Sequence, residues 1–149
     1  MNIVRTNSTN QDFINLVKLL DQELAIVDGD DHAFYHQFNN IDVLKHTIVL
    51  YENNIPVGCG AIKEYDETSA EVKRMYTLPE TRGKGIATKV LFELEKWAKE
   101  LNYKYTILET GKRQVEAINL YKKTGYQIIS NYGQYEGIEN SVCFRKELK

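Results

Sequence analysis

Residues 75–88 connect an expected strand to an expected helix through a glycine-rich turn, and this junction constrains the fold more than any other segment. Pro79 stops the strand because it has no backbone N–H to donate to a sheet. After the turn, apolar residues recur with helical periodicity from Ile86 to Leu101, which predicts an amphipathic helix of about four turns. A compact strand follows at 105–109. A strand–helix–strand unit of this kind is expected to form a right-handed parallel crossover.

The rest of the chain predicts an antiparallel arrangement around this unit. Apolar and β-branched runs predict strands at residues 2–5, 47–52, 55–65, 70–78, 126–132 and 141–147. Helical spacing of apolar residues predicts helices from Ser8 to about Leu24 or Ala25, at 33–38 and at 116–124. The element order is therefore β-α-α-β-β-β-α-β-α-β-β. This is an α+β fold whose central sheet is mixed, largely antiparallel and flanked by helices.

Local signals mark the ends of several elements. Ser8 and Gln11 stand at capping-box spacing, which predicts the start of the first helix. The Asp-Gly-Asp-Asp stretch at 28–31 is expected to end it. The two asparagines at 53–54 predict a tight turn with left-handed backbone. Gly125 is expected to adopt the left-handed conformation that terminates the last predicted helix.

Length and charge exclude several broad classes. The 149 residues predict a single domain over residues 1–149. A net charge of −2, from 19 Lys+Arg and 21 Asp+Glu, argues against a nucleic-acid partner. No apolar run approaches the roughly 20 residues that cross a membrane, and the start of the chain has no signal-peptide core, so we expect a cytoplasmic protein. Two cysteines cannot form a disulfide framework. Cys59 and Cys143 each lie in an expected strand and are expected to be small core residues.

The glycine-rich turn has the features of a phosphate cradle. The first amides of a helix lack intrahelical partners and lie at the positive end of its dipole, so they bind anions. A P-loop is excluded because Leu78 stands where its first glycine belongs, and a dinucleotide fingerprint is weakened by Thr88 at its third glycine position. The pattern Arg/Gln-x-x-Gly-x-Gly/Ala is matched in full by residues 82–87. The alternative is an ordinary turn with a few solvated charges.

The chain resembles the GCN5-related N-acetyltransferases (the GNAT family), which bind acetyl-CoA with this pattern. A second segment, residues 116–126, is similar to the family's Ala-x-x-x-Tyr-x-x-x-Gly-Phe/Tyr motif. The resemblance covers almost the whole chain in element order and implies the GNAT acyl-CoA N-acyltransferase fold. It also implies acetyl-CoA as co-substrate, held in a wedge between two splayed strands.

The resemblance assigns residues to the acetyl-CoA site. The backbone at residues 75–77 would hold the pantetheine arm as an added strand, and the amides of residues 83–88 would hold the pyrophosphate. The family often has an asparagine where this chain has Gln114, and Asn119, one helical turn further on, is the alternative for that contact. The expected cofactor-binding residues are Met75, Tyr76, Thr77, Arg82, Gly83, Lys84, Gly85, Ile86, Ala87, Thr88, Gln114 and Asn119.

Two residues are candidates for catalysis. Tyr121 stands at the motif position that often donates a proton to the leaving thiolate in the family; the alternative is a buried core tyrosine. Glu109 ends a compact strand beside the expected wedge and is the candidate base. The alternatives for Glu109 are a structural ion pair or a substrate-orienting contact.

The acceptor site is expected to be acidic. Residues 21–31 carry five acidic residues and no basic one, so we hypothesise that Asp28, Asp30 and Asp31 attract a cationic amine. The aromatic residues expected to line the site are Phe34, Tyr35, Tyr132 and Tyr135, for which edge packing is the alternative. The alternative is a solvated loop at the helix end. His32 and His36 have a spacing that can bind metal, but convincing further ligands are lacking and no metal site is expected.

The function predicted from the sequence is direct acetyl transfer from acetyl-CoA to the primary amine of a small molecule or peptide. The enzyme alternatives are transfer of another acyl group or transfer to a hydroxyl. The non-enzyme alternative is a CoA-binding sensor or partner-binding module, which has no need of a proton donor at Tyr121. We expect a monomer or a homodimer, with no membrane partner.

Overall fold

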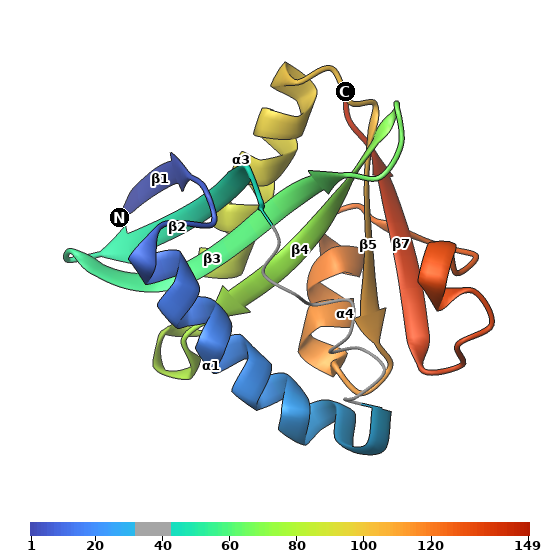
Figure 1. Ribbon diagram of the computed structural model, residues 1–149, viewed down its shortest axis with the longest axis horizontal. Coiled ribbons are helices and arrows are strands. Elements are labelled where there is room, and N and C mark those ends of the chain that lie inside the picture. The colour runs from blue at the N-terminus through green and yellow to red at the C-terminus, as the bar shows by residue number, and fades with distance from the viewer. Residues whose placement is uncertain (32–42) are drawn as a thin grey trace.

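The computed structural model describes residues 1–31 and 43–149, which build one seven-stranded mixed sheet in the order β1-β2-β3-β4-β5-β7-β6 (Figure 1). The strands are β1 (Asn2–Thr6), β2 (His46–Glu52), β3 (Ile55–Glu64), β4 (Ser69–Thr77), β5 (Tyr105–Gly111), β6 (Gln127–Ile129) and β7 (Ser141–Glu147). The helices are α1 (Gln11–Asp28), α3 (Ile86–Glu100) and α4 (Val115–Lys123). Neighbouring strands are antiparallel except β4 and β5, which confirms the predicted fold class. The helix predicted at 33–38 lies outside the described residues.

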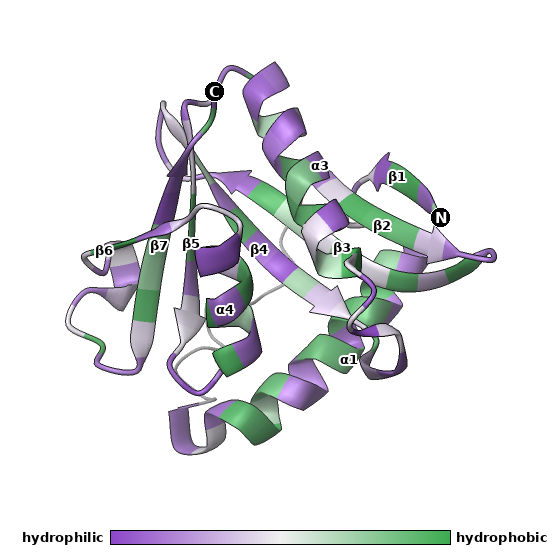
Figure 2. Cartoon of the chain, turned by 180° about the vertical axis from the view of Figure 1, so that it is seen from behind, coloured by the Kyte–Doolittle hydropathy of each residue, from purple (hydrophilic) through white to green (hydrophobic). Residues whose placement is uncertain are grey.

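Helices cover both faces of the sheet, because each face is apolar (Figures 1 and 2). The α3 and α4 face holds the larger core cluster, which includes Ile62, Leu91, Leu108 and Phe144. On the opposite face, Phe13 and its helical neighbours on α1 pack against β2, β3 and β4. None of the helices in the described part of the chain is both long enough and apolar enough to cross a membrane.

The ends of α1 differ from the sequence prediction. Asn10, and not Ser8, caps the helix: its side-chain oxygen accepts from the amide of Phe13 at 3.0 Å. The Ser8 hydroxyl accepts instead from the amide of Leu44, which ties the start of the helix to the segment before β2. The helix runs past its predicted end at Leu24 or Ala25 to Asp28, and it ends in the predicted Asp-Gly-Asp-Asp stretch, where Gly29 has a φ of 55°.

The turns behave largely as predicted. Asn53 and Asn54 both have positive φ between β2 and β3, and Gly125 has a φ of 97° after α4. The strand predicted at 126–132 is shorter, since only residues 127–129 pair with β7.

The parallel pair β4 and β5 opens along its length, and this opening positions the site. Only Ser69, Ala70 and Glu71 of β4 pair with β5. Beyond Glu71 the two strands diverge toward their carboxyl ends (Figure 1), while β5 stays paired with β7 to its last residue. The remainder of β4 therefore has strand β3 on one side and an open edge on the other.

Candidate active site

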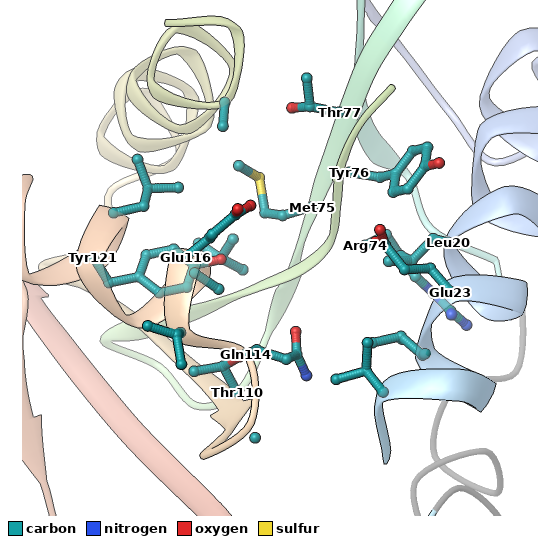
Figure 3. A pocket seen from close by; sticks show the side chains of 18 of the residues that line it. Leu20, Glu23, Arg74, Met75, Tyr76, Thr77, Thr110, Gln114, Glu116 and Tyr121 are labelled. Atoms are coloured by element: carbon teal, nitrogen blue, oxygen red, sulfur yellow. The ribbon is translucent and has the colours of Figure 1, made fainter. Parts of the chain in front are cut away.

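A cavity of about 720 Å³ lies at the opening between β4 and β5 and is lined by residues of α1, β4, α3, β5 and α4. Its volume is within the range of small-molecule sites in proteins. Figure 3 shows side chains from α1 on one side and α4 on the other, with β4 running between them. Three parts of the chain that are far apart in sequence, near residues 28, 75 and 121, thus border one space.

The glycine-rich turn forms the end of the cavity at the head of α3. Gly83 and Gly85 have φ values of 86° and 77°, and a Cβ atom at either position would meet nothing within 4 Å. Gly85 is the N-cap residue, and no side chain caps the helix. The first amides of α3 therefore remain available for an anion, and the turn beside them leaves room for one to approach. The site fits the pyrophosphate of a CoA molecule.

The two charged residues of the turn have different roles. Arg82 lines the cavity. Its Nε donates to the carbonyl of Thr77 at 3.0 Å and its Nη2 donates to Glu23 on α1 at 2.9 Å. Lys84 is not among the lining residues and pairs with Glu52 at 3.2 Å. Arg82 thus links the end of β4 to α1, whereas Lys84 contributes positive charge only from outside the cavity.

A distorted residue in β4 precedes the segment predicted to bind pantetheine. Arg74 has a φ of 59°, which is unusual for a residue other than glycine, and the register between β3 and β4 shifts nearby. Its buried side chain reaches Asp21 on α1 at 3.4 Å. Residues 75–77 follow this bulge and line the cavity, with no β5 partner for their backbone. Such an edge can accept an extended ligand as an added strand.

Tyr121 is both a core residue and a lining residue of the cavity. Its side chain is 6% exposed and contacts the rings of Tyr126 and Phe144. Figure 3 shows it among the side chains on the α4 side of the cavity. Burial, and then the nearby charge of Glu109, raise the pKa of the phenol above its usual value. The hydroxyl is therefore protonated at neutral pH and is available as a donor.

Glu109 is the titratable group of β5 that faces the cavity. Burial raises its pKa to about 7, the hydrogen bond from Ser141 opposes this shift, and the charges of Asp28 and Glu71 add to it. Its Oε2 atom is buried and accepts no hydrogen bond from the described residues. A carboxyl group with a pKa near neutrality, beside a cavity, has the properties of a general base.

The predicted acceptor residues are only partly brought to the cavity. Asp28 lines it and is 2% exposed. Asp30 and Asp31 are not among the lining residues, and Asp31 pairs with Arg113 at 3.2 Å. Arg113 also donates to the backbone carbonyl of Asp28 at 2.7 Å, so it joins the end of α1 to the segment after β5. Phe34 and Tyr35 lie outside the described residues, as do His32 and His36.

Two charged cavity residues, Glu71 and Lys73 on β4, were not singled out from the sequence as acceptor-site groups. Tyr135, which lies between β6 and β7, lines the cavity as expected. Glu71 is buried and accepts a hydrogen bond from Tyr132 at 2.5 Å. The available signal was the alternation of Glu71 and Lys73 with apolar residues, which marks one face of a strand. That pattern normally indicates a solvated face, and only the opening of the sheet turns it toward a cavity.

Residues 13–126 match the model of the Acetyltransferase (GNAT) family. The chain belongs to the GNAT family. It is 34% identical over 100 residues to the uncharacterized N-acetyltransferase YsnE of Bacillus subtilis, covering 66% of this chain and 66% of that protein. It is 36% identical over 102 residues to the IAA acetyltransferase of Azospirillum brasilense, covering 68% and 67% of the two chains. The matched regions therefore span about two thirds of these relatives.

Solved structures of GNAT proteins agree with the fold over nearly the whole chain. A predicted acyl-CoA N-acyltransferase from Klebsiella pneumoniae has a TM-score of 0.82 and 29% identity, covering 99% of this chain and 97% of that one. A GNAT acetyltransferase from Elizabethkingia anophelis with acetyl-CoA bound has a TM-score of 0.70 at 18% identity, covering 99% and 97%. These structures show the GNAT fold, and the match to the acetyltransferase family model supports the acyltransferase class with acetyl-CoA as co-substrate.

Most residues expected to bind acetyl-CoA in this GNAT protein border the cavity. They are Met75, Tyr76, Thr77, Arg82, Gly83, Gly85, Ile86, Ala87, Thr88 and Gln114. Of the two alternatives for the amide contact, Gln114 lines the cavity, while Asn119 lies exposed on α4 and does not. In the described part of the chain, no group of three or more His, Cys, Asp or Glu side chains could hold a metal ion.

Proposed function

We propose that this protein transfers the acetyl group of acetyl-CoA directly to a primary amine in a ternary complex. The observation that carries the proposal is that one cavity is bordered by the amide cradle of α3, the open edge of β4, the Tyr121 hydroxyl and the Glu109 carboxyl. Direct transfer needs an anchor for the donor, a base for the amine and an acid for the leaving sulfur. The cradle and the β4 edge would anchor the donor, Glu109 would be the base and Tyr121 would be the acid.

The donor would be held by backbone groups. The amides at residues 83–88 would bind the pyrophosphate, and the open edge of residues 75–77 would bind the pantetheine arm. Bound acetyl-CoA supplies the thioester that is transferred. A backbone amide at residues 75–77 would also stabilise negative charge on the carbonyl oxygen during transfer.

Two side chains would move protons. Glu109, with its pKa at about 7, is substantially ionised at neutral pH and would accept a proton from the acceptor ammonium. Tyr121, which stays protonated because its pKa is raised, would donate to the departing sulfur. The charge of Glu109 also contributes to the raised pKa of Tyr121, so ionised Glu109 helps to keep the phenol protonated.

The acceptor is proposed to be a cationic amine. Five carboxyl groups of the described residues line the cavity, and three of them, those of Asp28, Glu71 and Glu109, interact: the charges of Asp28 and Glu71 both raise the pKa of Glu109. Asp28 and Glu71 are buried, so the electrostatic attraction between them and an ammonium group is weakly screened. Glu71 thus joins Asp28 in this role, in place of Asp30 and Asp31, which lie outside the cavity.

The test is release of CoA thiol by the purified protein across a panel of primary amines, with matched alcohols. The panel includes mono-, di- and polyamines, amino acids and peptide amines, and acetyl-CoA is compared with longer acyl-CoAs. Acceptor-dependent thiol release with amines supports the proposal. Tight CoA binding without acceptor-dependent release would instead indicate a CoA-binding module, and faster release with alcohols would indicate an O-acyltransferase.

A further inference from the structure

Lys73 is a primary amine built into the acceptor side of the cavity. It lies on β4, two residues after Glu71, where pairing between β4 and β5 ends. Its side chain is only 15% exposed and lines the cavity. The mechanism proposed above does not use it.

The charges around Lys73 are those that would receive an acceptor ammonium. Its Nζ lies 3.8 Å from Oε1 of Glu71, and Glu109 on the facing strand acts on it electrostatically. Glu71 is itself fixed by the hydroxyl of Tyr132, which donates to its other oxygen. The lysine therefore presents an amine to the same carboxyl groups that are proposed to bind the external amine.

Burial also favours the nucleophilic form of this amine. Desolvation lowers the pKa of Lys73 below its usual value, and the charges of Arg74 and Lys63 act in the same direction. The carboxylates of Glu71 and Glu109 oppose the shift but do not cancel it. A larger fraction of Lys73 is thus neutral at a given pH than for a solvent-exposed lysine.

We propose that Lys73 is an internal acetyl acceptor, so that the protein acetylates its own Lys73 when acetyl-CoA is bound and no external amine is present. This inference rests on the proposed function. The Nζ lone pair attacks the thioester carbonyl carbon, the N–C bond forms and the C–S bond breaks. Glu109 takes the proton lost by nitrogen, and Tyr121 gives a proton to sulfur. The products are N-ε-acetyl-Lys73 and CoA thiol.

The position of Lys73 along β4 places it close to the donor segment. Only one residue separates it from residues 75–77, the edge proposed to hold the pantetheine arm. Lys123 also lines the cavity, but it is exposed and lies in the last turn of α4. It is the matched internal control, because it borders the same cavity without lying beside the open edge of β4.

The experiment incubates the full-length protein with acetyl-CoA carrying a ¹³C-labelled acetyl group and no amine acceptor. Peptides are then analysed by mass spectrometry, after acetyl groups present before incubation have been mapped. We expect label at Lys73 to appear at least about tenfold faster than at Lys123, consistent with the contribution of general base catalysis. Thiol release without acceptor should reach about one equivalent per chain and should be absent in Lys73→Arg but retained in Lys123→Arg.

Two further variants separate enzymatic from spontaneous acetylation. Glu109→Gln should slow labelling of Lys73 without changing labelling of exposed lysines, and Gly85→Glu should abolish the preference for Lys73. Equal rates at Lys73 and Lys123, or an unchanged preference in Gly85→Glu, would overturn the inference. If amines are acetylated while Lys73 stays unlabelled, only this inference fails. If acetyl-CoA does not bind, the proposed function fails with it.

Discussion

At the scale of single residues, the ionisation of Glu109 is expected to control the pH dependence of activity. The carboxylate must be ionised to accept a proton, so kcat/KM should rise with pH through about 7. This rise near pH 7 is the acidic limb of the pH profile. Glu109→Gln should lose the limb and keep any rise at higher pH that comes from deprotonation of the acceptor amine. Glu116→Gln, which changes an exposed carboxyl group lining the same cavity, is the control and should keep the limb. A limb near 7 that persists in Glu109→Gln would exclude the assignment.

The same pKa shift predicts a cost in stability. The folded state favours protonated Glu109, with a pKa of about 7 against 4.5 for the unperturbed group. The stabilisation that protonated Glu109 gives the folded state is therefore fully present below the unfolded pKa. It is lost as pH rises through 7, which lowers the free energy of unfolding by an amount on the order of 3 kcal/mol. Urea unfolding should find Glu109→Gln more stable than the wild type at pH 8 and similar to it at pH 4. Equal stability at pH 8 would contradict the shift.

Tyr121 is expected to act as the acid and not only as a core residue. Tyr121→Phe removes one oxygen and keeps the ring contacts, so turnover should fall roughly 10²–10⁴-fold with CoA affinity nearly unchanged. Tyr126→Phe is the matched control, because that hydroxyl is bonded to Glu95 and Thr106 in the core and does not line the cavity. It should lower stability and leave turnover within a few-fold. Wild-type turnover in Tyr121→Phe would exclude the acid role.

The sequence could predict Glu109 and Tyr121 at the cavity but not Glu71 and Lys73. The first two stand at a strand end and within a motif, and both positions depend on local order along the chain. The other two lie inside a strand, where alternating polar residues normally face water. Their burial depends on the departure of β4 from β5, which is a property of the sheet and not of either residue.

At the scale of elements, the turn into α3 should bind phosphate through its backbone. Gly85→Glu introduces a side chain at a φ of 77° and a negative charge at the cradle, so CoA affinity should fall by at least about 100-fold. Gly137→Glu is the matched control: its φ is 78°, a Cβ atom would meet nothing within 4 Å, and it does not line the cavity. Calorimetric titration with CoA measures both. Equal loss in the two variants would attribute the effect to backbone strain alone.

Element boundaries show where local signals are decisive and where they compete. The left-handed turn at residues 53–54 and the glycine after α4 follow from intrinsic backbone preferences and were predicted. The cap of α1 was not, because Ser8 and Asn10 are both good capping residues and a contact with Leu44 occupies Ser8. That contact joins positions 36 residues apart, and local spacing contains no information about it.

At the scale of the whole molecule, the near-zero net charge conceals two differently charged regions around one cavity. The α3 end carries Arg82 beside open amides, while the side proposed for the acceptor carries the carboxyl groups of Asp28, Glu71 and Glu109 together with a single lysine on β4, Lys73. Opposite ends of this kind match a donor with phosphates and an acceptor with an ammonium group. Composition alone argued against a generic basic surface. The sequence indicated a basic segment and an acidic segment, but only the fold determines which acidic residues line the cavity.

The opening of the sheet predicts that CoA stabilises the molecule as a whole. β4 and β5 are paired at only three residues, so a ligand added along residues 75–77 would bridge the two halves of the sheet. At about 100 times its dissociation constant, CoA should add about 2.7 kcal/mol to the free energy of unfolding, which corresponds to a Tm increase of roughly 5–10 °C for a chain of this size.

Hydrogen exchange distinguishes bridging from binding elsewhere. Amides of residues 72–77 and 108–111, which flank the opening, should gain the most protection with CoA, while β1 and β2 should change little. In Gly85→Glu both the Tm increase and the added protection should disappear, whereas Gly137→Glu should retain them. Stabilisation without added protection at residues 72–77 would mean that CoA binds outside the opening, and the assignment of β4 as its backbone partner would then be wrong.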